Sequence, residues 1–130
     1  MFYELQAKIN ETNPQGKSTT ATHKYLTECE LYAEAEHAIL QQHANNETYS
    51  ITKSKLKEIV NSQQGEDKAF VATLQQEYDI DGKKSAMKYD VLVFAPDFDM
   101  ARQTIKDYLR QDYTDMELVK LSESKIEAVL

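Results

Sequence analysis

One short stretch of this chain occurs twice, and it limits the fold more than any other feature. Residues 51–60 read Ile-Thr-Lys-Ser-Lys-Leu-Lys-Glu-Ile-Val, and residues 121–130 read Leu-Ser-Glu-Ser-Lys-Ile-Glu-Ala-Val-Leu. Each copy has a strand-like aliphatic residue and a hydroxyl, then Ser-Lys-aliphatic and an apolar close, and each follows a helix-like segment. This similarity indicates that one small unit was duplicated.

The first half of the chain changes its hydrophobic period twice. Apolar and polar side chains alternate in residues 3–9, which predicts a strand with one buried face. Residues 10–17 contain Pro and Gly and predict a turn, and residues 19–29 predict a second, antiparallel strand. Residues 31–44 have a helical period and are rich in Ala, Glu and Gln. Residues 48–53 predict a third strand, with Tyr49 and Ile51 facing inward.

The order of these elements predicts the topology of the first half. The helix should end at Asn45-Asn46, because Asn tolerates the left-handed conformation that closes many helices. The second and third strands are joined through that helix, so a parallel crossover is expected between them. The first strand then lies in the middle of the sheet, between the second and the third.

The second half repeats this order after a polar, glycine-containing segment. Asp-Gly is a strong signal for a tight hairpin, and a strand with apolar residues on both faces should be the most buried one. Asp99 is expected to cap the second helix. The predicted elements are a linker at 61–67, a strand through Phe70–Leu74, a hairpin turn at 79–84, the most buried strand at 87–95, a helix from about Met100 to Gln111, and a strand at 116–121.

Two tandem ββαβ repeats are therefore predicted, in an α+β fold related by pseudo-two-fold symmetry, with helices packed on an antiparallel or mixed sheet. A shift of 66 residues places Ala35 on Ala101 and Ile39 on Ile105. The predicted halves are residues 1–60 and 68–130, separated by the linker at 61–67, in one compact domain overall.

Composition excludes several classes of function. The chain has 130 residues and a formal net charge of -7, which argues against direct binding of nucleic acid and is compatible with a protein partner that has a basic surface. One cysteine, Cys29, excludes an intramolecular disulfide and favours a reducing cytosol. The sequence has no signal-peptide pattern and no membrane-spanning run, so a cytoplasmic location is expected.

The histidines and the cysteine do not predict a catalytic or metal site. His23 lies on a predicted strand, whereas His37 and His43 are six residues apart on a helix and therefore lie on different faces. Cys29 aligns with Ala95 under the 66-residue shift, so it is interpreted as a small core residue.

The charged clusters are interpreted in the same way. Asp79, Asp81 and Gly82 faintly resemble a calcium loop but lack its closing Glu, and they are assigned to a hairpin turn. Asp97 and Asp99 begin a helix, where one carboxylate caps and the other meets the helix dipole. The basic cluster Lys53, Lys55 and Lys57 is interpreted as a solvated face. No catalytic, cofactor-binding or metal-binding residue is assigned, and the protein is predicted not to be an enzyme.

Self-association is a further expectation. Leu26, Leu92 and Phe94 alternate onto the sheet faces away from the helices. We expect these side chains to be covered, either by packing of the sheets of the two halves on each other or by formation of a homodimer.

Several segments together resemble a known family. They are Tyr3-Glu4, Tyr32-Ala33-Glu34-Ala35-Glu36 and Ser122-Glu123-Ser124-Lys125-Ile126. The pattern resembles a domain-of-unknown-function family, number four-four-nine-four, of small proteins in the Bacteroides group, their mobile elements and phages. The resemblance covers nearly the whole chain and implies a phage or mobile-element origin, but it brings no catalytic residues and no cofactors.

Exclusion and charge together predict a non-catalytic, cytosolic protein-binding module that docks on a host or viral protein, for example RNA polymerase or another nucleic-acid enzyme. One alternative is a structural or self-assembling protein. Another is a small metal-dependent hydrolase or nuclease that would use Asp97, Asp99 and a distant histidine.

Overall fold

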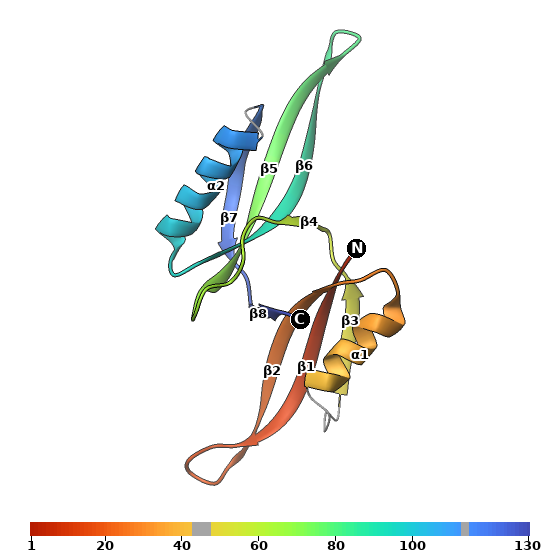
Figure 1. Cartoon of the computed structure of the whole chain (residues 1–130), viewed down its shortest axis with the longest axis vertical. Helices are drawn as coiled ribbons and strands as arrows, with labels where there is room; N and C mark the ends of the chain where they lie inside the picture. Colours follow the sequence, from red (N-terminus) through yellow and green to blue (C-terminus); the bar gives the residue numbers. More distant parts are fainter. Residues whose placement is uncertain (43–47, 113–114) are drawn as a thin grey trace. The chain divides into compact units, whose positions relative to one another are not determined.

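A computed structural model describes residues 1–42, 48–112 and 115–130 of the chain (Figure 1). Within these ranges the strands form two four-stranded sheets, with the orders β3-β1-β2-β8 and β4-β6-β5-β7. Both sheets are mixed and each carries a helix, so the α+β class is confirmed. The elements are β1 Phe2–Thr12, β2 Ser18–Glu28, α1 Tyr32–Gln42, β3 Thr48–Lys53, β4 Leu56–Ile59, β5 Lys68–Ile80, β6 Lys83–Ala95, α2 Phe98–Asp112, β7 Met116–Glu123 and β8 Ile126–Val129.

The chain divides into two compact units, and the division is not consecutive in sequence. The first unit combines Met1–Ser54 with Ile126–Leu130, and the second unit is Lys55–Lys125. The predicted halves place residues 55–60 with the first repeat and residues 126–130 with the second. In the structure β4 pairs in parallel with β6 of the second unit, and β8 pairs in parallel with β2 of the first.

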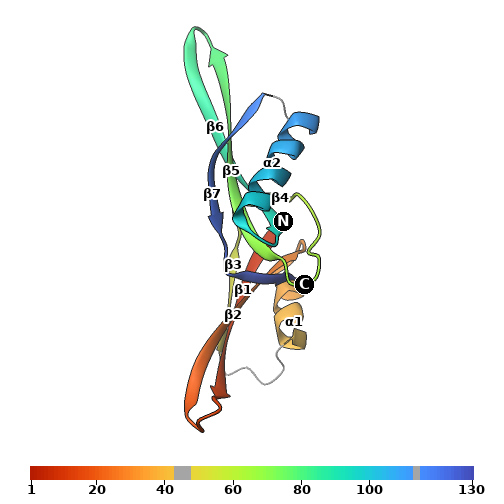
Figure 2. The ribbon, with the colours of Figure 1, turned by 90° about the vertical axis from the view of Figure 1, so that its left-hand side faces the viewer.

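In the first unit, α1 covers one face of a sheet whose central strand is β1 (Figure 2). β1 pairs antiparallel with both β2 and β3, which confirms the predicted order with the first strand in the middle. The buried residues of this core are Leu5, Ala7 and Tyr25 from the strands and Ala35 and Ile39 from the helix. The predicted end of the helix at Asn45-Asn46 lies outside the described residues.

In the second unit, α2 packs on β5, β6 and β7. Ala101, Ile105 and Leu109 lie at helical spacing and contribute the helix side of the core. The last five residues of β6 are all buried, as expected for a strand with two apolar faces. The buried residues supplied by the strands are Phe70, Ala72, Leu74, Val91, Val93, Ala95 and Met116.

Two local signals decide where elements of the second unit begin and turn. Ile80 pairs with Lys83 across the two-residue loop Asp81-Gly82, and both loop residues have positive φ, 51° and 79°, as a type I′ turn requires. Asp97, and not Asp99, caps α2, because the Asp97 Oδ1 accepts a hydrogen bond from the N–H of Met100 at 2.8 Å. The predicted cap at Asp99 is wrong because the helix begins earlier, at Phe98.

The side chains expected to drive self-association are buried. Leu26 and Leu92 are 0% exposed, and Phe94 is 2% exposed. They are thus covered within one chain and offer a homodimer no surface. Formation of a homodimer by another surface is not tested, and the pseudo-two-fold relation of the two repeats stays a prediction.

The repeated stretch of sequence is the segment that passes from one unit to the other. The N–H of Ser54 donates to the carbonyl of Phe2, and the N–H of Ser124 donates to the carbonyl of Ala69, both at 2.8 Å. After these bonds the chain leaves its own sheet, and the next strand joins the other sheet. The repeated Ser-Lys-aliphatic sequence therefore marks an exchange of short strands, β4 and β8.

The two exchanged strands pair in matching ways. Lys24 lies opposite Ile126, and Asp90 lies opposite Leu56; the register shifts directly after each of these pairs. Each stretch ends with a backbone bond to its partner sheet, from Val60 to the carbonyl of Leu92 and from Leu130 to that of Leu26, both at 2.8 Å.

Candidate functional site

The histidines considered as candidate site residues do not come together in the described part of the structure. His23 lies on β2, and its Nδ1 is 3.0 and 3.1 Å from the two carboxylate oxygens of Glu127 on β8. His37 is exposed on α1, and His43 lies outside the described residues. Over the part of the chain that the structure describes, no three His, Cys, Asp or Glu side chains gather in a way that could hold a metal ion.

Cys29 follows β2 and lies close to the start of α1. Its thiol donates a weak hydrogen bond to the carbonyl of Leu31, with Sγ and O 3.4 Å apart. Burial and the nearby Glu34 carboxylate raise the pKa of this thiol, so the thiolate is disfavoured. A nucleophilic cysteine needs the opposite shift.

The aspartates at the start of α2 have local roles. Asp97 caps the helix, and Asp99 Oδ1 is 3.7 Å from the guanidinium of Arg102. Of the basic cluster, Lys53 ends β3, and Lys57 lines a hollow of about 280 Å³ with Met87, Lys88 and Tyr89.

An exposed mixed surface lies where α1 passes β3. Tyr32, Glu36 and Leu40 follow one another at intervals of four along α1, so they form one stripe on the helix. Tyr49 of β3 joins the stripe, because its hydroxyl donates to Oε2 of Glu36 at 3.0 Å. We call these four residues the α1 stripe.

Apolar groups of the α1 stripe are open to solvent. Tyr32 is 53% exposed, Leu40 39% and Tyr49 40%. Tyr32 is held in place by an edge-to-face contact with Tyr3, with ring centroids 6.4 Å apart. An exposed aromatic that is already ordered loses little side-chain entropy on binding, so the stripe suits a protein contact.

The stripe also carries negative charge. The hydrogen bond to Glu36 raises the pKa of Tyr49, because an ionised phenolate could not donate to the carboxylate. The carboxylate of Glu36 therefore stands beside a neutral phenol. Within the α1 stripe this carboxylate has Tyr49 as an aromatic neighbour.

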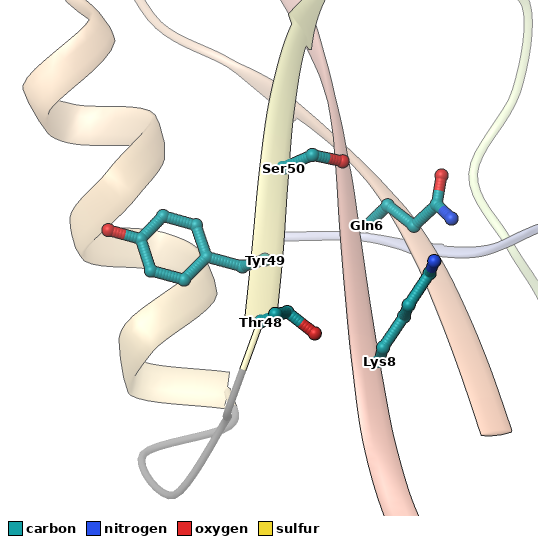
Figure 3. Close-up of a pocket in the computed structure, with 5 residues that line it drawn as sticks. All are labelled: Gln6, Lys8, Thr48, Tyr49 and Ser50. Atoms are coloured by element: carbon teal, nitrogen blue, oxygen red, sulfur yellow. The ribbon is translucent and has the colours of Figure 1, made fainter. Parts of the chain in front are cut away.

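A shallow hollow lies on the other side of β3. Gln6 and Lys8 of β1 and Thr48 and Ser50 of β3 point to the sheet face opposite the helix, whereas Tyr49 points toward α1 (Figure 3). The hollow has a volume of about 260 Å³. Tyr49 also contributes to its lining, and the amide, hydroxyl and ammonium groups of the other four side chains give it hydrogen-bonding capacity.

The α1 stripe was not predicted from the sequence. The alternation of residues 48–53 correctly predicts that Tyr49 lies on the helix side of the sheet, but it does not predict that the side chain is 40% exposed. The four-residue spacing of Tyr32, Glu36 and Leu40 was the available signal.

Fold and surface together define an α+β protein of two four-stranded mixed sheets with an exposed helix–strand surface. No helix within the described ranges has the length and apolar character needed to cross a membrane. The chain belongs to the family described as domain of unknown function (DUF4494), whose model matches residues 1–130. Neither the curated proteins nor the solved structures contain a match.

Proposed function

We propose that this protein is a non-catalytic, cytosolic binding module, encoded by a phage or a mobile element, that docks on a host or viral protein with a basic surface. RNA polymerase or another nucleic-acid enzyme is the class of target that such a surface fits. The observation that carries the proposal is the α1 stripe, in which Tyr32, Leu40 and Tyr49 are exposed around the carboxylate of Glu36.

The composition of the stripe matches what protein interfaces use. Tyrosine supplies a large contact area with few rotatable bonds, and aromatic side chains with arginine dominate binding hot spots. A Lys or Arg of the partner would meet Glu36 and the tyrosine rings together, so that ion pairing and cation–π attraction act at one place.

The net charge of -7 supports association with a basic partner. Complementary potentials mainly raise the association rate, and salt screens them over about 8–10 Å. Binding should therefore weaken as salt rises. The same charge disfavours direct contact with a phosphate backbone.

The test is an affinity capture from host lysate at low and at high salt, followed by mass spectrometry. The discriminating variant is Glu36→Lys, and its matched control is Glu77→Lys, an equal change of charge at an exposed position of β5. We expect a protein that is recovered at low salt, reduced at high salt, retained by the control and lost by Glu36→Lys.

Two results would contradict the proposal. One is recovery of no protein partner at low salt. The other is recovery of a small molecule or a nucleotide in place of a protein.

A further inference from the structure

β3 ends the first sheet, and its outer edge exposes a regular row of backbone groups. The N–H of Ser54 bonds to the carbonyl of Phe2, and bonded and non-bonded positions alternate along an antiparallel ladder. The pairing of β1 with β3 has no register shift, so the positions that bond to β1 are Thr48, Ser50 and Thr52. The N–H and C=O groups of Tyr49, Ile51 and Lys53 consequently point away from β1, and within the described ranges no strand lies beyond them.

The corresponding edge of the second sheet is interrupted. β7 pairs with β5 through a register shift, in which Thr73 faces Lys120 and Leu74 faces Leu118, so Val119 is the extra residue of a bulge. Three charged residues occur along this strand, Glu117, Lys120 and Glu123. Bulges and edge charges are the devices by which proteins prevent strand addition. β3 has no bulge, and its one charged residue is Lys53.

Each face of a strand added to β3 would meet a different lining. On the helix side it would pass Tyr49 and Glu36 of the α1 stripe. On the opposite side it would pass the hollow lined by Gln6, Lys8 and Ser50 (Figure 3). An edge with side-chain sites on both faces is what peptide recognition by strand addition uses, because alternate residues of the peptide point to opposite faces.

We propose that the outer edge of β3 accepts an extended segment of the protein partner as an added strand. Basic and apolar side chains of the segment point toward the α1 stripe, and polar side chains point toward the hollow. This inference rests on the proposed docking function and specifies its site and mode. The backbone groups of Tyr49, Ile51 and Lys53 supply the added ladder, and Glu36 supplies selection for a basic residue.

Charge favours a partner segment over a second copy of this chain. Two copies that pair through β3 would bring together two chains of net charge -7. Like charges placed close together across paired strands are destabilising. The electrostatic interaction of this acidic chain with a basic segment is instead attractive.

The test separates the backbone from the side chain at one position. Tyr49→Pro removes the outward N–H and leaves the ladder with β1 intact, because proline is tolerated on an edge strand where its nitrogen faces solvent. Tyr49→Ala, the matched control, loses the same ring but keeps the N–H. The probe is a short end-blocked peptide of alternating threonine and arginine, which presents arginine to one face and a polar side chain to the other, and the readout is amide chemical shifts and hydrogen exchange.

The peptide should slow exchange at Tyr49, Ile51 and Lys53 of the wild-type chain. Tyr49→Ala should weaken binding by about threefold to tenfold, and Tyr49→Pro should abolish it. Glu36→Gln should weaken binding by about threefold, the size expected for an exposed ion pair. Alternate backbone N–H groups of an added strand point toward β3, so the same peptide N-methylated at its arginines or at its threonines should bind in only one of the two forms.

Three outcomes would overturn the inference: equal binding to the proline and alanine variants, protection of amides elsewhere, or a dimer of the protein alone that Tyr49→Pro dissolves. Different results would contradict the docking function itself. A natural partner that binds Tyr49→Pro as well as wild type would leave docking in place and remove β3 as its site. Absence of any salt-dependent protein partner would remove the docking function.

Discussion

Replacing one aliphatic residue in an exchanged strand should destabilise the sheet that receives the strand, and not the repeat to which the residue belongs in sequence. Ile126 of β8 is 4% exposed and joins the first sheet, although it lies 124 positions after Phe2, the start of β1. Its equivalent under a 70-residue shift is Leu56 of β4, which is 9% exposed and joins the second sheet. Ile126→Ala and Leu56→Ala are therefore matched perturbations.

The magnitude follows from burial. Truncation of a buried Ile or Leu to Ala removes its hydrophobic transfer free energy and leaves a cavity, which together cost about 2–5 kcal/mol. At about 3 kcal/mol, the population of open states in the affected sheet should rise roughly a hundredfold. Leu56 is buried slightly less completely than Ile126, which places its cost at the lower end of this range.

Native-state hydrogen exchange is the assay. We expect Ile126→Ala to accelerate exchange in β1 and β2, and Leu56→Ala to accelerate it in β5 and β6. Acceleration in the reverse pattern, or equal acceleration of both sheets by both variants, would show that the exchanged strands do not determine the stability of the sheets that they join.

Two further predictions concern single groups. The side chain of Asn61 donates a hydrogen bond to the carbonyl of Phe94 and accepts one from the N–H of Phe94, both at 2.8 Å. Asn61→Ala leaves these two partly buried backbone groups unpaired, so it should lower the free energy of unfolding measured in urea by about 1–3 kcal/mol. Asn61→Asp keeps only the acceptor, so its stability should fall between those of the alanine variant and the wild type. Burial, and next the charge of Glu127, raise the pKa of Tyr25 above 10.0, so its contribution to stability is complete below pH 10 and is lost as pH rises through the folded-state pKa. Tyr25→Phe should therefore reduce the loss of stability measured by urea unfolding across that alkaline range, and an unchanged slope would contradict the assignment.

Much of the fold follows from hydrophobic period and turn chemistry. The predicted range of β3 matches the structure, and the Asp81-Gly82 turn and the central position of β1 are also confirmed. β5 and β6 are longer than the predicted strands. The prediction was too short because residues in their outer parts, such as Lys83 and Lys84, are exposed and show no alternation of apolar and polar side chains.

The exchange of β4 and β8 could not be read from periodicity. Each strand has only four residues, with Leu56 and Ile126 as the sole buried side chains. A pattern that short fits a loop as well as a strand, and its partner lies far away in sequence. The candidate site was missed for a related reason, because exposure of Tyr49 depends on how α1 passes β3, which no local pattern encodes.

The exchange also has a consequence for how the protein is made. The first sheet lacks its β8 strand until residues 126–130 have been synthesised, so β2 has an unpaired edge while residues 55–125 are still being added. At about 5–20 residues per second, that interval lasts several seconds. During this time, nascent chains on neighbouring ribosomes of one message could pair with each other through β2. Emergence of residues 126–130 supplies β8 and closes that edge.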